Sequence, residues 1–486
     1  MNTNLQNLLN KKLSRKGFLG FGVVLFASAF GVYEGLSNFG TTTPGTTTPG
    51  TTTPSRFPFA ASISSNKRYI VDQNGDPWLM VGDSPQCLMT NLAPAEMATY
   101  FANRQSLGFN CVLIMAIVGP DNGNGNSNYA NYNGVAPFTG TAISSQPNSA
   151  YFDLVVTMVE LAASYGLTVI LDPAEAGDFL APIQSAGGKA CFKYGAYLGT
   201  LLANQPNVIW QSGGDYGSWP GDDDVVLQVA AGIASTAPHQ LQSVELLATE
   251  ANGPALSTDD SAWPNEFSST FYNGVYDYWS TYPAVLDGYN HSPVFPVWGQ
   301  EYNYEGENNA ELDGSAAVSL QSLRAQQYWT MTCGATGSLF GNHYLWGFIS
   351  GWQSNLSTPG AEQFGYLASL FKSVAWYKLV PDQSHTFMTG GYGTAGGDQA
   401  DPQSDAYCTA ALTADGTLGV AYLPTSATIT VAMSKMAGTT TARWYDPTMG
   451  TYASIDTYPN AGTRSFTSPG AHGDGSDDWV LVLTAP

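Results

Sequence analysis

From about residue 56 to residue 380, short apolar runs alternate with longer segments of helical period. The runs at 111–117 and 167–172 are almost continuously apolar, which is typical of strands buried on both faces of a parallel sheet. The segment at 151–165 repeats apolar residues at the three- and four-residue spacing of a helix. This alternation predicts β-α-β units and therefore the α/β fold class.

Eight strand–helix pairs can be counted, which predicts a (β/α)8 TIM barrel over residues 56–380. The expected strands are 79–82, 111–117, 167–172, 208–211, 243–248, 268–272, 296–300 and 337–340. The clearest expected helices are 94–107, 151–165, 189–204, 222–235, 276–286, 315–333 and 361–374. Because the region is longer than the ~250 residues typical of this fold, we expect the surplus to lie in loops.

After about residue 381 the helical period gives way to short alternating runs. These runs lie at 406–412, 418–422, 428–432, 440–445 and 479–483. Between two of them, residues 446–450 carry the proline and glycine of a chain reversal. The pattern predicts a small antiparallel β-sandwich over residues 381–486.

The first 40 residues have the pattern of an export signal. Four basic residues between positions 11 and 16 precede an apolar run at 18–30, whose Ala27-Ser28-Ala29 offers small residues for cleavage. Ser14-Arg15-Lys16 resembles a twin-arginine signal with lysine as the second basic residue. The alternative is an uncleaved membrane anchor, but the apolar run is shorter than the ~20 residues of a spanning helix.

Residues 41–55 repeat threonine, proline and glycine and contain no apolar side chain to bury before the folded region. We therefore interpret this segment as a linker between the export signal and the barrel. Together the two segments predict a secreted or cell-envelope protein, with no membrane contact beyond an N-terminal anchor.

Composition narrows the choice of ligand. The chain has 38 acidic and 16 basic residues, a net charge of -22, which argues against nucleic acid and anionic membranes as partners. Only 11% of residues are charged and 13% are aromatic, which favours a neutral carbohydrate partner. The five cysteines and five histidines lack metal-ligand spacing, so we expect no metal and no cofactor. We also expect a monomer.

Two acidic residues lie where a barrel places its active site, at the carboxyl ends of its strands. Asp215 comes after the fourth expected strand and two glycines, and Glu301 comes directly after the seventh. Glycoside hydrolysis requires two carboxyl groups that flank the bond, and a separation near ~5 Å indicates retention of configuration. Strands four and seven face each other across the barrel mouth, so these acids suit those roles. The alternative for either acid alone is a helix N-cap or a salt bridge.

Other residues at the same end are weaker candidates. Asp83 follows the first strand and could bind sugar hydroxyls, although an N-cap or Asx-turn explains it equally well. Asp172 and Glu250 follow strands three and five and are expected to line the pocket. Most barrel aromatics are packing residues, but several could stack on sugar rings. These are Trp210, Trp298, Tyr302, Tyr304 and Trp346.

Several motifs are shared with one known family. They are Gly82-Asp83-Ser84, Gly108-Phe109-Asn110, Asn207 to Asp215, Glu301 to Glu305, Tyr328-Trp329 through Gly341-Asn342, Ala442 to Pro447 with Gly450, and Asp478 to Leu481. With these motifs the chain resembles the apiosidase-like glycoside hydrolases, which are barrel enzymes followed by a domain named for collagen binding. The resemblance extends over almost the whole chain after the linker.

The resemblance implies a retaining mechanism in which Asp215 is the acid/base, Glu301 is the nucleophile and Asp83 helps to bind the sugar. It also implies a role in plant polysaccharide breakdown, including release of apiose from pectin side chains. Gln86 departs from the family, which usually has an aromatic residue there. We place Gln86, Asn342 and His343 among the expected substrate-binding residues.

A second hypothesis is a non-catalytic extracellular protein whose barrel and sandwich bind carbohydrate or protein. Loss of either carboxylate would favour it, and both are present. We expect the second domain to be structural, with Arg443 and Trp444 locking it onto the barrel. Fold alone does not decide between the two hypotheses.

Overall fold

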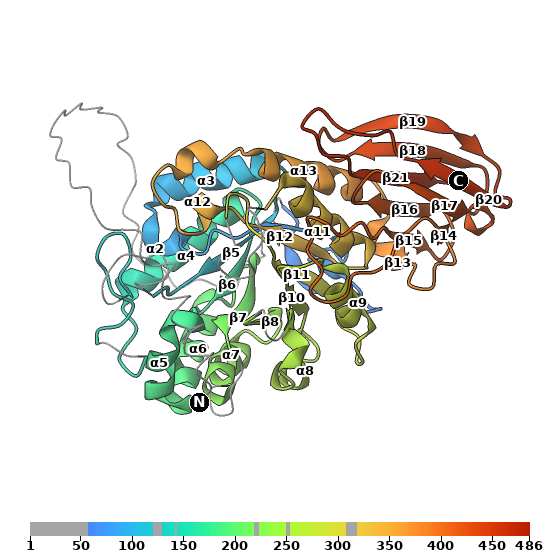
Figure 1. Ribbon diagram of the computed structural model, residues 1–486. Coiled ribbons are helices and arrows are strands. Elements are labelled where there is room, and N and C mark those ends of the chain that lie inside the picture. Colours follow the sequence, from blue (N-terminus) through green and yellow to red (C-terminus); the bar gives the residue numbers. More distant parts are fainter. Residues whose placement is uncertain (1–56, 120–128, 141–142, 218–222, 249–252, 308–317) are drawn as a thin grey trace, which may run out of the picture. The chain divides into compact units, whose positions relative to one another are not determined.

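The computed structural model describes residues 57–119, 129–140, 143–217, 223–248, 253–307 and 318–486 (Figure 1). The expected export signal, the expected linker and Glu250 lie outside these ranges. The described residues belong to one compact unit, 57–486. No helix within them is long and apolar enough to cross a membrane.

Eight parallel strands form a barrel, which confirms the expected (β/α)8 fold. In order around the sheet they are β8 (Gln242–Leu246), β7 (Val208–Tyr216), β6 (Thr168–Asp172), β5 (Cys111–Met115), β4 (Met80–Asp83), β12 (Gly337–Phe340), β11 (Val297–Glu301) and β10 (Asn273–Tyr276). The short β9 (Ala255–Leu256) adds antiparallel to β10. Gln242 of β8 closes the ring through backbone hydrogen bonds with Thr270 and Tyr272, just before β10.

A small three-stranded sheet covers the amino ends of the barrel strands. It consists of β1 (Ala60–Ile63), β2 (Ile70–Asp72) and β3 (Pro77–Trp78). The backbone amides of Ala60 and Ile70 donate to the hydroxyls of Thr168 and Thr336, which stand at the starts of two barrel strands. Ile70 and Trp78 pack into the barrel interior. The carboxyl ends of the strands are therefore the ends left for chemistry.

Helices surround the barrel in Figure 1. The longer ones are α3 (Pro94–Ser106), α4 (Ser149–Ser164), α5 (Ala176–Ala186), α6 (Gly188–Leu202), α7 (Asp223–Thr236), α9 (Tyr282–Asn290), α11 (Leu320–Thr332) and α13 (Pro359–Lys372). The shorter ones include α2 (Leu88–Asn91), α8 (Ala262–Glu266) and α12 (His343–Trp346). Glycine lets α6 and α7 approach closely, since a Cβ on Gly195 would lie 1.9 Å from the Val229 carbonyl oxygen. Of the longer helices, α5 was not expected from the sequence, and none of these three shorter ones was expected.

The expected sixth strand and helix were wrong by several residues. The sequence pattern placed the strand at 268–272, but β10 is Asn273–Tyr276, and α9 begins only at Tyr282. Aromatic residues before β10 produced the apolar signal, whereas the strand itself starts with Asn273 and Gly274. A Cβ at Gly274 would crowd the Gln300 side chain, whose amide oxygen would lie 2.1 Å away. The shift places Tyr276 at the carboxyl end of a barrel strand.

Two antiparallel sheets form the second domain, which confirms the expected sandwich. One sheet has the order β13 (Leu379–Pro381), β15 (Thr409–Thr413), β16 (Leu418–Leu423), β21 (Trp479–Thr484), β18 (Thr440–Asp446) and β19 (Thr451–Tyr458). The other consists of β14 (Met388–Gly390), β17 (Thr428–Ala432) and β20 (Thr463–Thr467). Side chains of both sheets share one core. The sequence missed β13, β14, β19 and β20, and most residues of β19 and β20 are exposed and carry little apolar alternation.

A buried ion pair joins α11 of the barrel to Asp478, the residue directly before β21 of the sandwich. Arg324 donates from Nε to Asp478 Oδ2 at 2.9 Å and from Nη2 to Oδ1 at 2.5 Å. Beside it, Tyr328 stacks on Tyr422 with ring centroids 5.0 Å apart. Tyr445 donates a hydrogen bond to the backbone oxygen of Tyr366 in α13. These contacts hold the two domains together.

The residues expected to lock the domains together do not do so. Trp444 lies in the sandwich's own core, and Arg443 stacks on the Tyr452 ring at 4.1 Å. Alternation along β18 explains the error, because side chains on a strand point to opposite faces. It is the next residue, Tyr445, that reaches the barrel.

A loop of the sandwich also contacts the barrel near α9. The backbone amide of Ser280 donates to the carbonyl of Ala400 at 2.9 Å. Tyr282 accepts from the Gly396 amide at 2.6 Å and donates to Asp405 at 3.0 Å. The sandwich thus supports the segment that follows β10.

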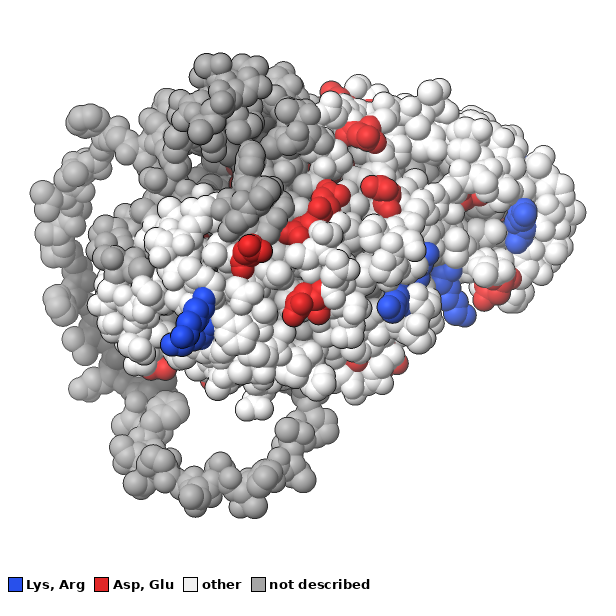
Figure 2. Space-filling model, turned by 90° about the horizontal axis from the view of Figure 1, so that it is seen from below, with Lys and Arg blue, Asp and Glu red and all other residues white. Residues whose placement is uncertain are grey.

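The face in Figure 2 is largely uncharged, with acidic side chains gathered over its middle. This agrees with the low charged fraction of the sequence. Such a surface is compatible with a neutral partner.

Candidate active site

Four carboxyl groups gather at the carboxyl end of the barrel. They are Asp172 of β6, Asp215 of β7, Glu245 of β8 and Glu301 of β11. Each of the other three repels the charge of Glu245 and so helps to raise its pKa. The structure therefore brings together three acids that the sequence named and adds Glu245, which it did not.

An irregular stretch of β7 presents Asp215. Gly213, Gly214 and Asp215 have φ angles of 106°, 77° and 54°. A positive φ is rare for a residue with a side chain and often marks a functional site. The pairing of β7 with β8 shifts between Ser212 and Tyr216, so Asp215 lies within the strand rather than after it. A Cβ on Gly213 would lie 2.3 Å from the Glu245 carbonyl oxygen, which explains why glycine is required.

Two tyrosines connect Asp215 with Glu301. The Tyr276 hydroxyl lies 2.9 Å from Asp215 Oδ1, and the Tyr278 hydroxyl lies 2.8 Å from Glu301 Oε1. The two hydroxyls are 2.7 Å apart. Sequence reasoning missed both tyrosines because it assigned Tyr276 to a helix. The pattern Tyr-Asp-Tyr directly after a correctly placed strand would have indicated them.

The second oxygen of Glu301 lies against two further groups. Glu301 Oε2 is 3.3 Å from Gln86 Nε2 and 3.3 Å from the Tyr304 hydroxyl, which is also 2.8 Å from Ser84 Oγ. Burial, followed by the charge of Asp215, raises the pKa of Glu301 to about 7, while hydrogen bonds from Tyr276 and Tyr278 oppose the rise. Gln86 and Tyr304, both expected substrate-binding residues, thus lie directly on Glu301.

Glu245 and Asp172 are buried more deeply. Glu245 accepts hydrogen bonds from the Gln211 amide and from the Asp215 backbone amide. A Cβ on Gly214 would lie 3.5 Å from Asp172 Oδ2, so Asp172 lies against the irregular part of β7. Burial raises the pKa of both groups well above the ordinary range. Glu245 escaped the sequence analysis because the expected strand ran on to residue 248, whereas β8 ends at Leu246.

Three expected substrate-binding residues point elsewhere. Asp83 pairs with Arg104 and Tyr100 of α3, because alternation turns Asp83 outward and Ser84 inward. Trp210 belongs to the layer between the barrel and its helices, where its indole donates to Gln240. The Tyr302 hydroxyl lies 2.7 Å from that of Thr330 in α11, so Tyr302 belongs to that packing. All three side chains are therefore engaged in pairing or packing away from Glu301, and a role for them in sugar binding stays a prediction.

The remaining candidates vary in position. Asn342 caps α12 and donates to Glu305. His343 has 39% of its side chain exposed, and its Nδ1 lies 3.8 Å from Glu307. Trp346 is half-buried beside Met115, which itself lies close to Gly214 in β7. Trp298 packs inside the barrel against Tyr272. Trp346 and His343 are therefore the candidates placed to meet a ligand near the mouth.

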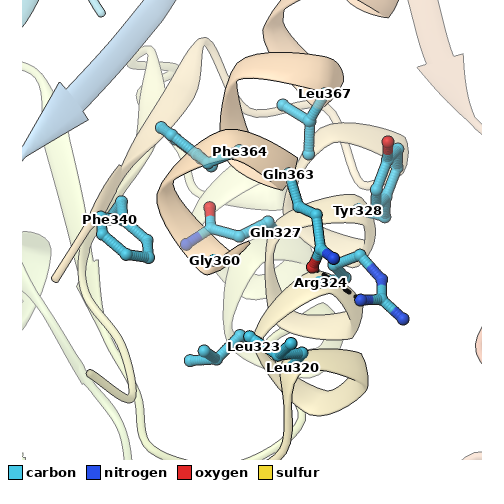
Figure 3. Close-up of a pocket in the computed structure, with 10 residues that line it drawn as sticks. All are labelled: Leu320, Leu323, Arg324, Gln327, Tyr328, Phe340, Gly360, Gln363, Phe364 and Leu367. Carbon is cyan, nitrogen blue, oxygen red and sulfur yellow. Dashed lines mark hydrogen bonds between the residues drawn. The ribbon is translucent and has the colours of Figure 1, made fainter. Parts of the chain in front are cut away.

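A small pocket elsewhere does not belong to this site. It lies between α11 and α13, and Figure 3 shows Arg324 bonded to Gln363 at its edge. Its volume of about 10 Å³ is enough for roughly one water molecule. Among the described residues, no group of three or more His, Cys, Asp or Glu side chains is arranged to hold a metal ion.

Comparison with protein families identifies the barrel. Residues 64–378 match the model described as "Apiosidase-like, catalytic domain". The chain belongs to the apiosidase-like family. Residues 397–484 match a second model, "Putative collagen-binding domain of a collagenase". This apiosidase-like chain is therefore a glycoside hydrolase with an accessory β domain.

Solved structures share the fold of the apiosidase-like chain. One described as a glycoside hydrolase is 19% identical, has a TM-score of 0.72, and matches over 88% of this chain and 97% of its own. A glycoside hydrolase family 5 structure from Bacteroides vulgatus ATCC 8482 is 20% identical, with a TM-score of 0.73 and coverage of 87% and 93%. At such identities the likeness concerns the fold. No curated protein matches the chain.

Proposed function

We propose that this chain is a secreted, retaining glycoside hydrolase that acts on plant or microbial polysaccharide, pectin-type side chains included. Asp215 serves as the acid/base and Glu301 as the nucleophile. The observation that carries the proposal is the line of hydrogen bonds from Asp215 on β7 to Glu301 on β11, across the carboxyl end of the barrel. A sugar bound there would have one carboxyl group on each side of its bond.

The contacts of Glu301 support its role as nucleophile. Tyr278 faces one carboxylate oxygen, and Gln86 and Tyr304 face the other. Donors aimed at both oxygens stabilise a carboxylate and hold it in one orientation for attack. An amide at position 86 thus replaces the family's usual aromatic residue with a hydrogen-bond donor to Glu301.

The proposed reaction has two steps. First, Asp215 gives its proton to the glycosidic oxygen while the Glu301 carboxylate attacks the anomeric carbon, and the bond to the leaving sugar breaks. Then Asp215 takes a proton from water, whose oxygen attacks the same carbon and releases Glu301. Two inversions give net retention. The reaction requires that the pair hold one proton in the free enzyme.

Secretion is proposed on the sequence alone. The basic and apolar residues of positions 1–40, followed by the linker, are typical of an exported enzyme. Fractionation of the producing cells with an antibody should find the chain outside the cytoplasm, and N-terminal sequencing should find a start between residues 28 and 56. A chain confined to the cytoplasm with an intact N-terminus would rule out export.

Sugar release tests the activity. The chain from residue 57 is incubated with plant cell-wall polysaccharides and pectin fragments beside Asp215→Asn and Glu301→Gln. Asp153→Asn and Glu160→Gln are matched controls, because both acids are exposed on α4. We expect release by the wild type and controls and a loss of at least about 10³-fold in the two site variants. Equal release by all five proteins would refute the site assignment.

The stereochemistry tests the mechanism separately. Proton NMR of the first product should show the anomeric configuration of the substrate. An inverted product would leave hydrolysis intact but rule out Glu301 as nucleophile. If the wild type and its variants bind the polysaccharides but none of them releases sugar, the non-catalytic hypothesis is favoured.

A further inference from the structure

The contacts between Asp215 and Glu301 require more protons than the tyrosines possess. Three short oxygen–oxygen contacts join the four groups, at 2.9, 2.7 and 2.8 Å. A phenol has one proton, so two tyrosines supply two. If both donate outward to carboxylates, the contact between Tyr276 and Tyr278 has no proton. The third proton must then come from one of the carboxyl groups.

We propose that Tyr276 and Tyr278 form a proton link in which Asp215 and Glu301 share one proton and can exchange it. This inference rests on the proposed function of the two carboxyl groups. With the proton on Asp215, Asp215 donates to Tyr276, Tyr276 to Tyr278, and Tyr278 to the Glu301 carboxylate. With the proton on Glu301, every bond in the line reverses. Both arrangements satisfy all three contacts.

Exchange conserves atoms and charge. Glu301 gives its proton to the Tyr278 oxygen, Tyr278 gives its own proton to the Tyr276 oxygen, and Tyr276 gives its proton to Asp215 Oδ1. Three O–H bonds break and three form, and the negative charge moves from Asp215 to Glu301. No other reactant is needed. The outcome is the state required for attack, with an acid at Asp215 and a carboxylate at Glu301.

The surroundings of the link favour one shared proton. Tyr276 is 1% exposed, and the charges of Asp215, Glu301 and Glu245 all act on it. Glu301 faces Asp215, Tyr276, Tyr278, Tyr304 and Gln86, and Glu307 adds a further negative charge. Two ionised carboxylates in this acidic, buried group would repel each other. The raised pKa of Glu301 agrees with a proton resting there in the free enzyme.

The link resolves a conflict within the site. A raised pKa suits an acid, whereas the proposed role of Glu301 requires a carboxylate. A proton that can cross to Asp215 allows Glu301 to be protonated at rest and ionised during the reaction. Tyr276 and Tyr278 are positioning residues in this proposal, because they act through the two acids.

Infrared titration tests the link without substrate. The carboxyl bands of Glu301 and Asp215 are assigned by their loss in Glu301→Gln and Asp215→Asn. In the wild type we expect each carboxyl to titrate in two steps, since the two share a proton. In Tyr276→Phe or Tyr278→Phe the two steps should draw together by more than one pH unit. Tyr272→Phe is the control, because its hydroxyl bonds a backbone carbonyl inside the barrel.

Unchanged separation in both variants would overturn the proposal, because simple charge repulsion would then explain the coupling. Two tyrosine variants are used so that the test remains possible if one of them misfolds. Circular dichroism shows whether each variant is folded. Since no substrate is involved, this result stands whether or not hydrolysis is found.

A kinetic cycle provides the second test once a substrate is known. Each single variant should lower kcat/KM about 10- to 100-fold. If the link acts as one unit, the kcat/KM of the double variant should be no lower than that of the less active single variant. Losses that multiply would show two independent tyrosines and overturn the proposal.

Discussion

The molecule buries acidic groups in two different ways. At the seam between the domains, Asp478 is neutralised by Arg324 through two hydrogen bonds. At the carboxyl end of the barrel, the described partners of Glu301 are phenols and an amide, and its nearest charges are other acids. At the seam a cation balances the buried carboxylate. At the site no such cation in the described part of the chain contacts Glu301, and a proton shared among the acids limits the buried negative charge.

This difference separates stability from chemistry. A buried acid with a cation stays ionised, and removal of either partner leaves an isolated charge. A buried acid among acids has a raised pKa and holds a proton that it can give away. The first arrangement keeps a buried charge compensated within the fold, and the second prepares a reaction at the expense of stability.

The largest expected effect concerns the seam. Arg324→Met should lower the free energy of unfolding by roughly 3–5 kcal/mol, since it leaves Asp478 buried without its cation. The double variant Arg324→Met/Asp478→Leu should recover much of that loss. Urea unfolding measures both. Lys378→Met is the control, because its 3.6 Å contact with Asp415 is half-exposed. An equal effect of Arg324→Met and Lys378→Met would contradict the contrast between the two regions.

The next effect should have the opposite sign. The raised pKa of Glu301, about 7, means that the folded state holds this proton more tightly than the unfolded state. Its stabilising contribution is complete below about pH 4.5 and is lost as pH rises through about 7. Glu301→Gln removes this loss, so it should gain about 3 kcal/mol over the wild type at pH 8 and little at pH 4. The gain should appear in unfolding curves at the two pH values.

Glu160→Gln, at an exposed position on α4, should show no such dependence on pH. A gain for Glu301→Gln that is equal at both pH values would mean that the proton is not held in the folded state.

The smallest effect is expected for a substitution at the contact between the sandwich loop and α9. Tyr282→Phe removes the hydroxyl that joins α9 to the sandwich loop, which should cost about 1 kcal/mol in unfolding. It should also lower kcat a few-fold more than it raises KM, because the loop supports the segment that carries Tyr278. Tyr132→Phe, exposed at the surface, is the control. If kcat is unchanged, the sandwich stabilises the chain without influencing the site.

The sequence predicted the fold well where burial leaves a pattern. Strands such as β5 and β6 are apolar throughout because they are buried on both faces. It failed at β10, where Asn273 and Gly274 weaken the signal, and at β19, where exposure removes it. At both places the strand forms because it pairs with a neighbouring strand, and its own residues give little apolar pattern.

The candidate site was predictable only in part. Asp215 and Glu301 could be named because acids at the carboxyl ends of strands are recognisable along a chain. The contacts of Asp83 with α3 were not predictable, because the direction of a side chain depends on register, which turns Ser84 inward instead. Glu245 was missed because it fell inside the expected strand 243–248, and Tyr276 and Tyr278 were missed because the sixth strand was expected too early, at 268–272.

The most direct test of the account is the identity of the nucleophile. Asp215→Ala, given an aryl glycoside of the released sugar, should form the covalent intermediate and hydrolyse it slowly, because the base of the second step is absent. Intact-protein mass spectrometry should then show one added sugar, and peptide mapping should place it on Glu301. An adduct on Glu245 or another residue, or rapid turnover without any adduct, would contradict the account.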